Sequence, residues 1–147
     1  MRPALVLAPL ALLAACAPPA SQPTPPTAAP ATYQCLLPTE HRMLVAELFF
    51  GRSIKGGGFV TDAEWSRFVI DTVIHNFPDG YTVFDGMGGW RDTKTGRTER
   101  DPTKILLVAA DRAPDLAGRL QSVIDVYKAR FRQKSVGIIT RDSCAAF

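Results

Sequence analysis

The spacing of apolar residues divides the chain beyond residue 40 into strands and helices. Residues 43–50 form a short, mostly apolar run that Gly51 stops, which predicts a buried strand. Residues 61–64, Thr-Asp-Ala-Glu, have the spacing of a helical capping box, and residues 78–80, Pro-Asp-Gly, end the helix that it begins. The apolar stripe of this helix consists of Trp65, Phe68, Val69, Val73 and Phe77.

Strand patterns return after this helix. Residues 81–84 have strand character, and the glycines at positions 86, 88 and 89 interrupt it. The polar residues 92–97 predict a hairpin loop, and residues 104–109 predict the return strand.

A second helix and a last strand complete the pattern. The helix follows Pro114, which suits a first helical turn, and residues 136–140 predict a short strand. One buried face of the helix comprises Leu116, Leu120, Val123, Ile124, Tyr127 and Phe131. The order βαββαβ predicts an α+β, ferredoxin-like domain, in which a four-stranded antiparallel sheet carries two helices on one face.

This topology makes a prediction about the cysteines. The last strand of a ferredoxin-like sheet lies antiparallel beside the first, so the two ends of the domain meet. Cys35 precedes the first strand and Cys144 follows the last. We therefore expect a disulfide between them, as an even pair in an oxidising compartment also suggests.

The N-terminal segment has the parts of a secretion signal. Arg2 precedes an apolar stretch over residues 4–13, and small residues precede Cys16. Residues 13–16, Leu-Ala-Ala-Cys, resemble the lipobox of bacterial lipoproteins. The resemblance implies that residues 1–15 are a lipoprotein signal peptide and that Cys16 carries the lipid that holds the chain on the membrane.

The segment behind Cys16 predicts a spacer. Residues 16–32 are rich in proline and alanine and have neither charge nor large apolar side chains, which favours an extended linker. Residues 33–147 form one domain. We expect a lipid-anchored protein of the bacterial cell envelope, on the outer membrane facing the periplasm by default. Ordinary secretion is the alternative, because residues 15–17 also fit a small-x-small cleavage site.

Charge and motifs exclude several function classes. The chain carries a net charge of +3 with both signs interspersed, so nucleic acid is not an expected partner. The glycine-rich residues 51–58 lack both the Walker spacing and the dinucleotide fingerprint. Two histidines do not make a convincing metal cluster. We therefore expect no metal and no cofactor.

Glu47 is the main candidate for chemistry, because a carboxylate within an apolar strand is costly to bury unless it is paired or protonated. Three interpretations stay open. Glu47 forms a buried ion pair with Arg52, Arg91 or Lys104, it is exposed on the open sheet face, or it binds a ligand or catalyses a reaction.

A second set of candidates lies around the predicted hairpin. Trp90 offers an aromatic platform beside several charged residues, which could together bind an anion or a glycan. A solvated loop is the alternative. The charged residues are Arg91, Arg97, Glu99 and Arg100. The candidate ligand-binding residues are therefore Glu47, Arg52, Trp90 and Arg91.

The sheet is predicted to have apolar residues on both faces of its first strand and of residues 105–109. Helices in this fold cover only one face. We expect a second subunit to cover the other, which makes a homodimer through the open sheet face; a bound ligand or folded loops are alternatives.

Five short motifs in this order resemble a bacterial family of small envelope proteins, domain-of-unknown-function family 3574. They are residues 46–52 (AELFFGR), 62–65 (DAEW), 77–80 (FPDG), 90–92 (WRD) and 127–131 (YKARF). The resemblance spans nearly the whole domain and implies an envelope location. It carries over no catalytic residues.

These observations favour a membrane-tethered, non-enzymatic binding or structural module, because no recognised catalytic set is present. The alternative is a small ferredoxin-like enzyme, of the dimeric α+β barrel type, that uses Glu47 with an arginine.

Overall fold

The computed structural model describes residues 34–147. The predicted signal peptide, the lipidation site Cys16 and the linker over residues 16–32 lie outside the described residues. Along the chain the elements are β1 (His41–Gly51), α1 (Asp62–Phe68), η1 (Val69–Val73), α2 (Ile74–Asn76), β2 (Thr82–Arg91), β3 (Thr98–Ala110), α3 (Leu116–Phe131) and β4 (Gly137–Ala145).

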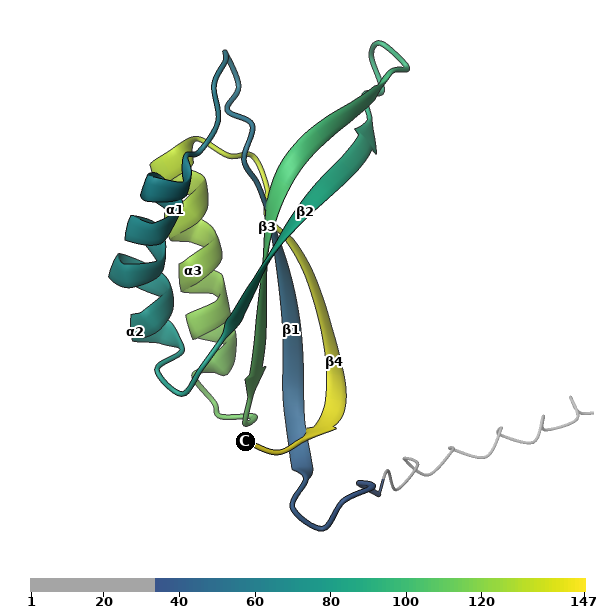
Figure 1. Cartoon of the computed structure of the whole chain (residues 1–147), viewed down its shortest axis with the longest axis vertical. Coiled ribbons are helices and arrows are strands. Elements are labelled where there is room, and N and C mark those ends of the chain that lie inside the picture. Colours follow the sequence, from purple (N-terminus) through teal and green to yellow (C-terminus); the bar gives the residue numbers. More distant parts are fainter. Residues whose placement is uncertain (1–33) are drawn as a thin grey trace, which may run out of the picture. The chain divides into compact units, whose positions relative to one another are not determined.

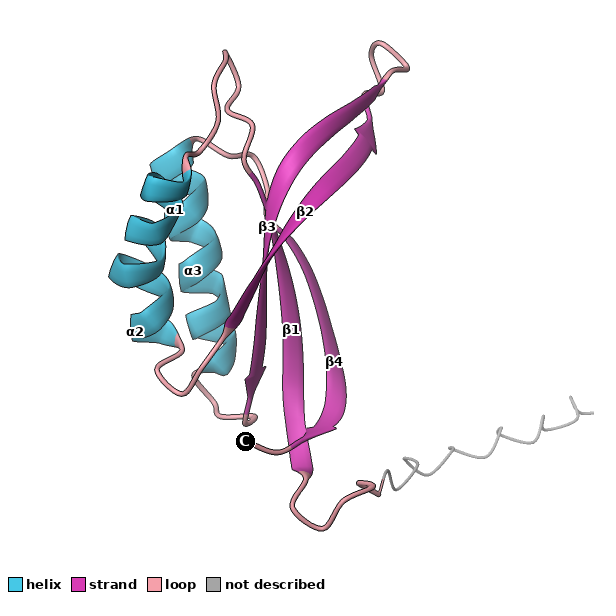
Figure 2. Cartoon of the chain, viewed as in Figure 1, coloured by secondary structure: helices cyan, strands magenta, loops and turns pink. Residues whose placement is uncertain are grey.

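The two helices predicted from periodicity are present. The segments α1, η1 and α2 follow one another without a break and make one helix with a π-helical middle turn. This helix and α3 lie side by side on one face of the sheet, and the other face is free of helices (Figures 1 and 2). The predicted capping box is also present, since the Thr61 side chain accepts from the Glu64 backbone and the Glu64 side chain accepts from the Thr61 backbone.

The sheet is antiparallel throughout and has the strand order β2-β3-β1-β4. The first and last strands are neighbours, with Arg42 opposite Cys144 and Phe49 opposite Gly137. The α+β, ferredoxin-like fold predicted from the element order is therefore confirmed.

The strands are longer than the sequence pattern predicts. β2 does not stop at the glycines but continues through them to Arg91, and β3 already begins at Thr98. Glycine weakens a strand without breaking its hydrogen-bond ladder, and it permits a close approach of neighbouring groups. Gly88 shows the effect, because a Cβ at this position would lie 3.1 Å from Oγ1 of Thr103. The resulting β2–β3 hairpin projects beyond the rest of the sheet (Figure 1).

The core lies between the sheet and the helices. Successive residues of β1 point to opposite faces of the sheet, and Ala46, Leu48 and Phe50 are buried against the helices. Ring centroids of Phe50 and Tyr127 are 4.7 Å apart in an edge-to-face contact, a geometry that aromatic pairs prefer. The buried Tyr127 hydroxyl donates to the carbonyl of Gly51 at 3.0 Å, and burial raises the pKa of Tyr127.

Cys35 and Cys144 form a disulfide with a Cα–Cα distance of 5.5 Å, in agreement with the sequence prediction. The bond ties the segment before β1 to the end of β4 across 109 residues of sequence. Within residues 34–147, no helix has the length and apolar character needed to span a membrane.

Replacing both Cys35 and Cys144 with alanine should lower the free energy of unfolding by about 2–4 kcal/mol, because the bond removes conformational freedom from the unfolded chain. Urea denaturation of the full chain and of the double variant measures the difference. Equal transition midpoints would show that the bond does not constrain the unfolded chain.

Candidate functional site

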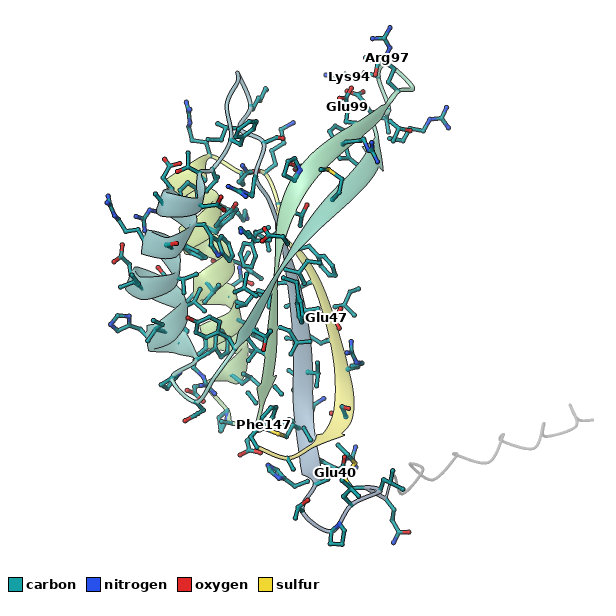
Figure 3. The ribbon with its side chains drawn as sticks, viewed as in Figure 1. Glu40, Glu47, Lys94, Arg97, Glu99 and Phe147 are labelled. Carbon is teal, nitrogen blue, oxygen red and sulfur yellow. A yellow bond between two sulfur atoms is a disulfide. The ribbon has the colours of Figure 1, made fainter. Side chains whose placement is uncertain are left out.

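The sheet face opposite the helices carries Glu47. Residues of β1 that alternate with the core residues point to this open face, and Glu47 lies among them near the middle of the strand (Figure 3). Its side chain is 25% exposed, and its Oε1 atom lies 2.7 Å from Nη1 of Arg141 on β4. The Arg141 side chain is 51% exposed. Glu47 is therefore a partly buried, paired carboxylate.

Apolar side chains surround this ion pair. Residues directly opposite each other in an antiparallel sheet share a face, so Leu107 and Ile139 flank Glu47. Further along the face, Phe84 lies opposite Ile105. Phe84 and Ile139 are about half exposed, at 50% and 52%. The open face thus combines a partly buried ion pair with accessible apolar side chains.

The predicted partners of Glu47 lie elsewhere. Thr82 is level with Glu47 across β3, and Arg91 is nine residues farther along β2, roughly 30 Å away at the usual strand rise. Arg91 is also exposed. The sequence pattern did not point to Arg141, because the predicted last strand ends at Thr140, whereas β4 continues through Arg141 to Ala145.

Arg52 and Lys104 instead belong to a structural ion network on the helix side. Nη1 of Arg52 and Nζ of Lys104 both lie 3.1 Å from Oδ1 of Asp62, in the first turn of α1. Nζ of Lys104 is also 2.6 Å from Oδ1 of Asp85 on β2. Arg52 in addition donates from Nε to the carbonyl of Val60. The network fixes the start of α1 against the sheet, so the predicted ion pair of Arg52 with Glu47 is wrong, and a ligand-binding role of Arg52 stays a prediction.

The hairpin candidates lie at an open concavity of about 840 Å³. Its walls come from the projecting β2–β3 hairpin, the loop after β1 and the connection between α3 and β4. Trp90, 55% exposed, lines it together with Glu99 and Arg100. Phe49, on the same sheet face as Glu47, is also part of the lining. Arg91 and Arg97 do not line it.

The sequence profile of a family described as "Protein of unknown function (DUF3574)" matches residues 45–147. The chain belongs to the DUF3574 family. The resemblance inferred from the five short motifs is thereby confirmed. No curated protein matches the DUF3574 chain.

Two solved structures share the fold of this DUF3574 domain. One is a phage SAM lyase in complex with S-methyl-5'-thioadenosine, at a TM-score of 0.55 and 11% identity, covering 71% of this chain and 90% of the other. The second is a phage SAM lyase in the apo state, at a TM-score of 0.53 and 14% identity, covering 79% of this chain and 97% of the other. At such identity the likeness demonstrates the fold.

These neighbours correct the leading prediction of function. We expected a non-enzymatic binding or structural module, whereas the two structures reported above, which share the fold, are of an enzyme. That prediction is wrong as the first choice, and its enzymatic alternative is taken up below.

The ion network gives the DUF3574 domain a pH dependence. The hydrogen bond with Asp85 raises the pKa of Lys104 above 10.5, and the hydrogen bond with Lys104 lowers the pKa of Asp62 below 3.8. The Asp62 contribution to stability is therefore present above pH 3.8 and is lost as the pH falls through its lower folded-state pKa. The Lys104 contribution is present below pH 10.5 and is lost as the pH rises through its higher folded-state pKa.

Asp62→Asn should flatten the acid side of the stability curve and leave much of the alkaline side, because Asp85 still pairs with Lys104. Urea midpoints measured across the acid and alkaline ranges test this expectation. Asp125→Asn is the matched control, because it removes the same charge from an exposed position on α3 outside the ion network. Oδ1 of Asp125 lies 3.9 Å from Nζ of Lys128. Acid-side slopes that are the same in all three proteins would contradict the assignment.

Proposed function

We propose that this chain is a small enzyme of the bacterial cell envelope that acts on a small molecule at the open sheet face. The observation that carries the proposal is the ion pair between Oε1 of Glu47 and Nη1 of Arg141, 2.7 Å apart and flanked by Leu107 and Ile139. A partly exposed ion pair contributes little to stability, so packing alone gives a weak reason for these two residues at this place. A paired carboxylate beside accessible apolar groups suits substrate binding and proton transfer.

Each residue has a role in this proposal. Glu47 acts as the general base and takes a proton from the substrate onto its carboxylate. The electron pair left on the substrate forms a double bond and expels the leaving group, which is an elimination reaction. Arg141 orients the carboxylate and binds an anionic group of the substrate. Phe84 and Ile139 contact its apolar part, because both side chains are about half exposed on the same face.

The substrate class follows from the charges and the fold. The apolar face suits a ring, the Glu47 carboxylate suits a cationic centre, and the Arg141 guanidinium suits a carboxylate of the substrate. S-adenosylmethionine has these groups, and two solved structures that are similar to this chain are of a phage SAM lyase. We propose an adenosyl sulfonium compound of this kind as the substrate.

The proposal also includes the location. The lipobox-like residues 13–16 support attachment through lipid on Cys16, and the proline-rich residues 16–32 support a spacer between membrane and domain. A disulfide suits an oxidising compartment such as the periplasm. We propose the outer membrane, facing the periplasm, as the location.

Glu47→Gln tests the reaction, because it keeps the shape of the side chain and removes the base. Turnover of S-adenosylmethionine, followed as release of S-methyl-5'-thioadenosine by chromatography, should fall about 100-fold or more. The free energy of unfolding should change by less than about 1 kcal/mol, since Arg141 is half exposed and stays solvated without its partner.

Asp125→Asn is again the control and should keep full activity. Absence of turnover by the unaltered full chain would contradict the proposed substrate. Full activity in Glu47→Gln would contradict the catalytic role, and an unfolded Glu47→Gln would assign the pair to structure instead.

We further propose that the enzyme is a homodimer in which a second copy packs on the open sheet face and leaves a cleft over Phe84 and Ile139 through which substrate enters. A two-fold axis between β1 and β4 would set Glu47 of each copy opposite Arg141 of the other. The covered face would exclude water from the reacting groups. Sedimentation of the full chain in detergent should give twice the monomer mass. A single monomeric species at micromolar concentration would contradict the dimer.

A further inference from the structure

The concavity at the hairpin end has a construction of its own, separate from the ion pair at Glu47. β1 ends at Gly51 opposite Thr103, whereas the β2–β3 ladder continues to Arg91 and Thr98. The hairpin therefore extends past the end of β1 (Figure 1). The space of about 840 Å³ lies between this extension and the two loops that follow β1 and α3.

The three walls of the concavity are fastened to one another at Ser53. Oδ1 of Asp101, on the hairpin, accepts from the backbone nitrogens of Arg52 and Ser53 at 3.2 and 2.9 Å. Nε2 of Gln133, in the connection between α3 and β4, donates to the carbonyl of Ser53 at 2.9 Å. Gly51 leaves room for this carboxylate, because a Cβ there would press against Oδ2 of Asp101 and displace it. The concavity is thus formed by connected walls before any ligand enters.

The charges along these walls are unequally satisfied. Two of the lining carboxylates already accept backbone hydrogen bonds: Asp101 from the loop after β1, and Asp92 from Lys94 and Thr95 within its own turn. Four lining cations come from all three walls, and among residues 34–147 none of them is within 4.0 Å of a carboxylate oxygen. These cations are Lys55, Arg100, Arg132 and Lys134. These four cations outnumber the three lining carboxylates, Asp92, Glu99 and Asp101, so the lining carries a net positive charge.

Arg132 occupies a position where arginine is unfavourable for the backbone. It ends α3 with φ 53° and ψ 37°, in the left-handed region that favours glycine, and it is the one residue other than glycine with positive φ in the described part of the chain. Its backbone nitrogen caps the helix by donating to the carbonyl of Lys128, which glycine would do equally well. Arginine at this position therefore carries a conformational cost, and Arg132 lines the concavity.

From these observations we propose that the concavity binds an acidic saccharide. The exposed indole of Trp90 packs against a sugar ring, and Arg132 with its neighbouring cations binds the carboxylate of the sugar. The lining offers both hydrogen-bond acceptors, such as the Glu99 carboxylate, and a side-chain amide that donates and accepts, Gln133. This combination suits a ligand with many hydroxyl groups. This binding does not depend on any reaction at Glu47.

Calorimetry on the full chain in detergent tests the proposal with a defined probe, a disaccharide of glucuronic acid and N-acetylglucosamine. The matched control ligand has glucose in place of glucuronic acid. The acidic disaccharide should bind saturably, and the neutral one should bind at least tenfold more weakly, because it lacks the carboxylate. Added salt should weaken only the acidic ligand.

Arg132→Gly separates binding from folding. Glycine suits the left-handed backbone, so the variant should unfold at the same temperature as the parent or higher, yet bind the acidic disaccharide about tenfold more weakly. Trp90→Ala should weaken both ligands. Arg67→Ala is the charge-matched control, since Arg67 lies on α1 outside the concavity, and its affinity should stay within about twofold.

Three results would overturn the proposal: no saturable binding of the acidic disaccharide, equal binding of the two disaccharides, or an Arg132→Gly variant that binds as tightly as the parent. Loss of S-adenosylmethionine turnover in Glu47→Gln with unchanged saccharide binding would show the two sites to be independent.

Discussion

Residues 34–147 supply two helices to cover a four-stranded sheet, and both lie on the same face (Figure 2). This constraint determines how β1 divides its residues. Alternate side chains of a strand point to opposite faces, so Leu48 and Phe50 enter the core while Glu47 and Phe49 remain on the uncovered side. A sheet covered by helices on both faces would have no place for a partly exposed ion pair beside accessible apolar groups. The proposed chemistry thus depends on the asymmetry of the fold.

The core-facing residues of β1 also hold in place the segments from which the loops of the concavity start. The edge-to-face contact of Phe50 with Tyr127 and the hydrogen bond from Tyr127 to Gly51 hold α3 against the end of β1. The ion network around Asp62 holds α1 at the same end. The loops after β1 and α3 therefore leave a well-supported edge, although the residues that line the concavity are mostly exposed. Stability and the second binding site share this support.

Local sequence pattern predicted the fold well because the periods of strands and helices are local properties. The stripe on α3, the capping box at Thr61 and the element order were sufficient for the ferredoxin-like topology, and the topology led to the Cys35–Cys144 bond. The extent of the hairpin was not predictable in this way. The three glycines predicted an interruption of the strand. The structure instead continues β2 through them, because hydrogen bonds to the neighbouring strand β3 outweigh the low strand propensity of glycine.

The sites were predictable only in part, since they depend on which strands become neighbours. Glu47 and Trp90 stand out in the sequence as residues that do not match their surroundings. Their partners do not: Arg141 reaches Glu47 through the pairing of β1 with β4, and Arg132 lines the concavity of Trp90 through the end of α3. Arg52, close to Glu47 in sequence, belongs instead to the helix-side network.

Footprinting of the full chain with hydroxyl radicals, read by mass spectrometry, tests most directly whether the open face is the working face. Phe84 and Ile139 report on this face, and Ile70 and Ile74, 59% and 41% exposed on the first helix, report on the opposite side. With S-adenosylmethionine present, modification of Phe84 and Ile139 should fall several-fold while modification of Ile70 and Ile74 is unchanged. Protection confined to Ile70 and Ile74, or no protection at all, would contradict substrate binding at the open face.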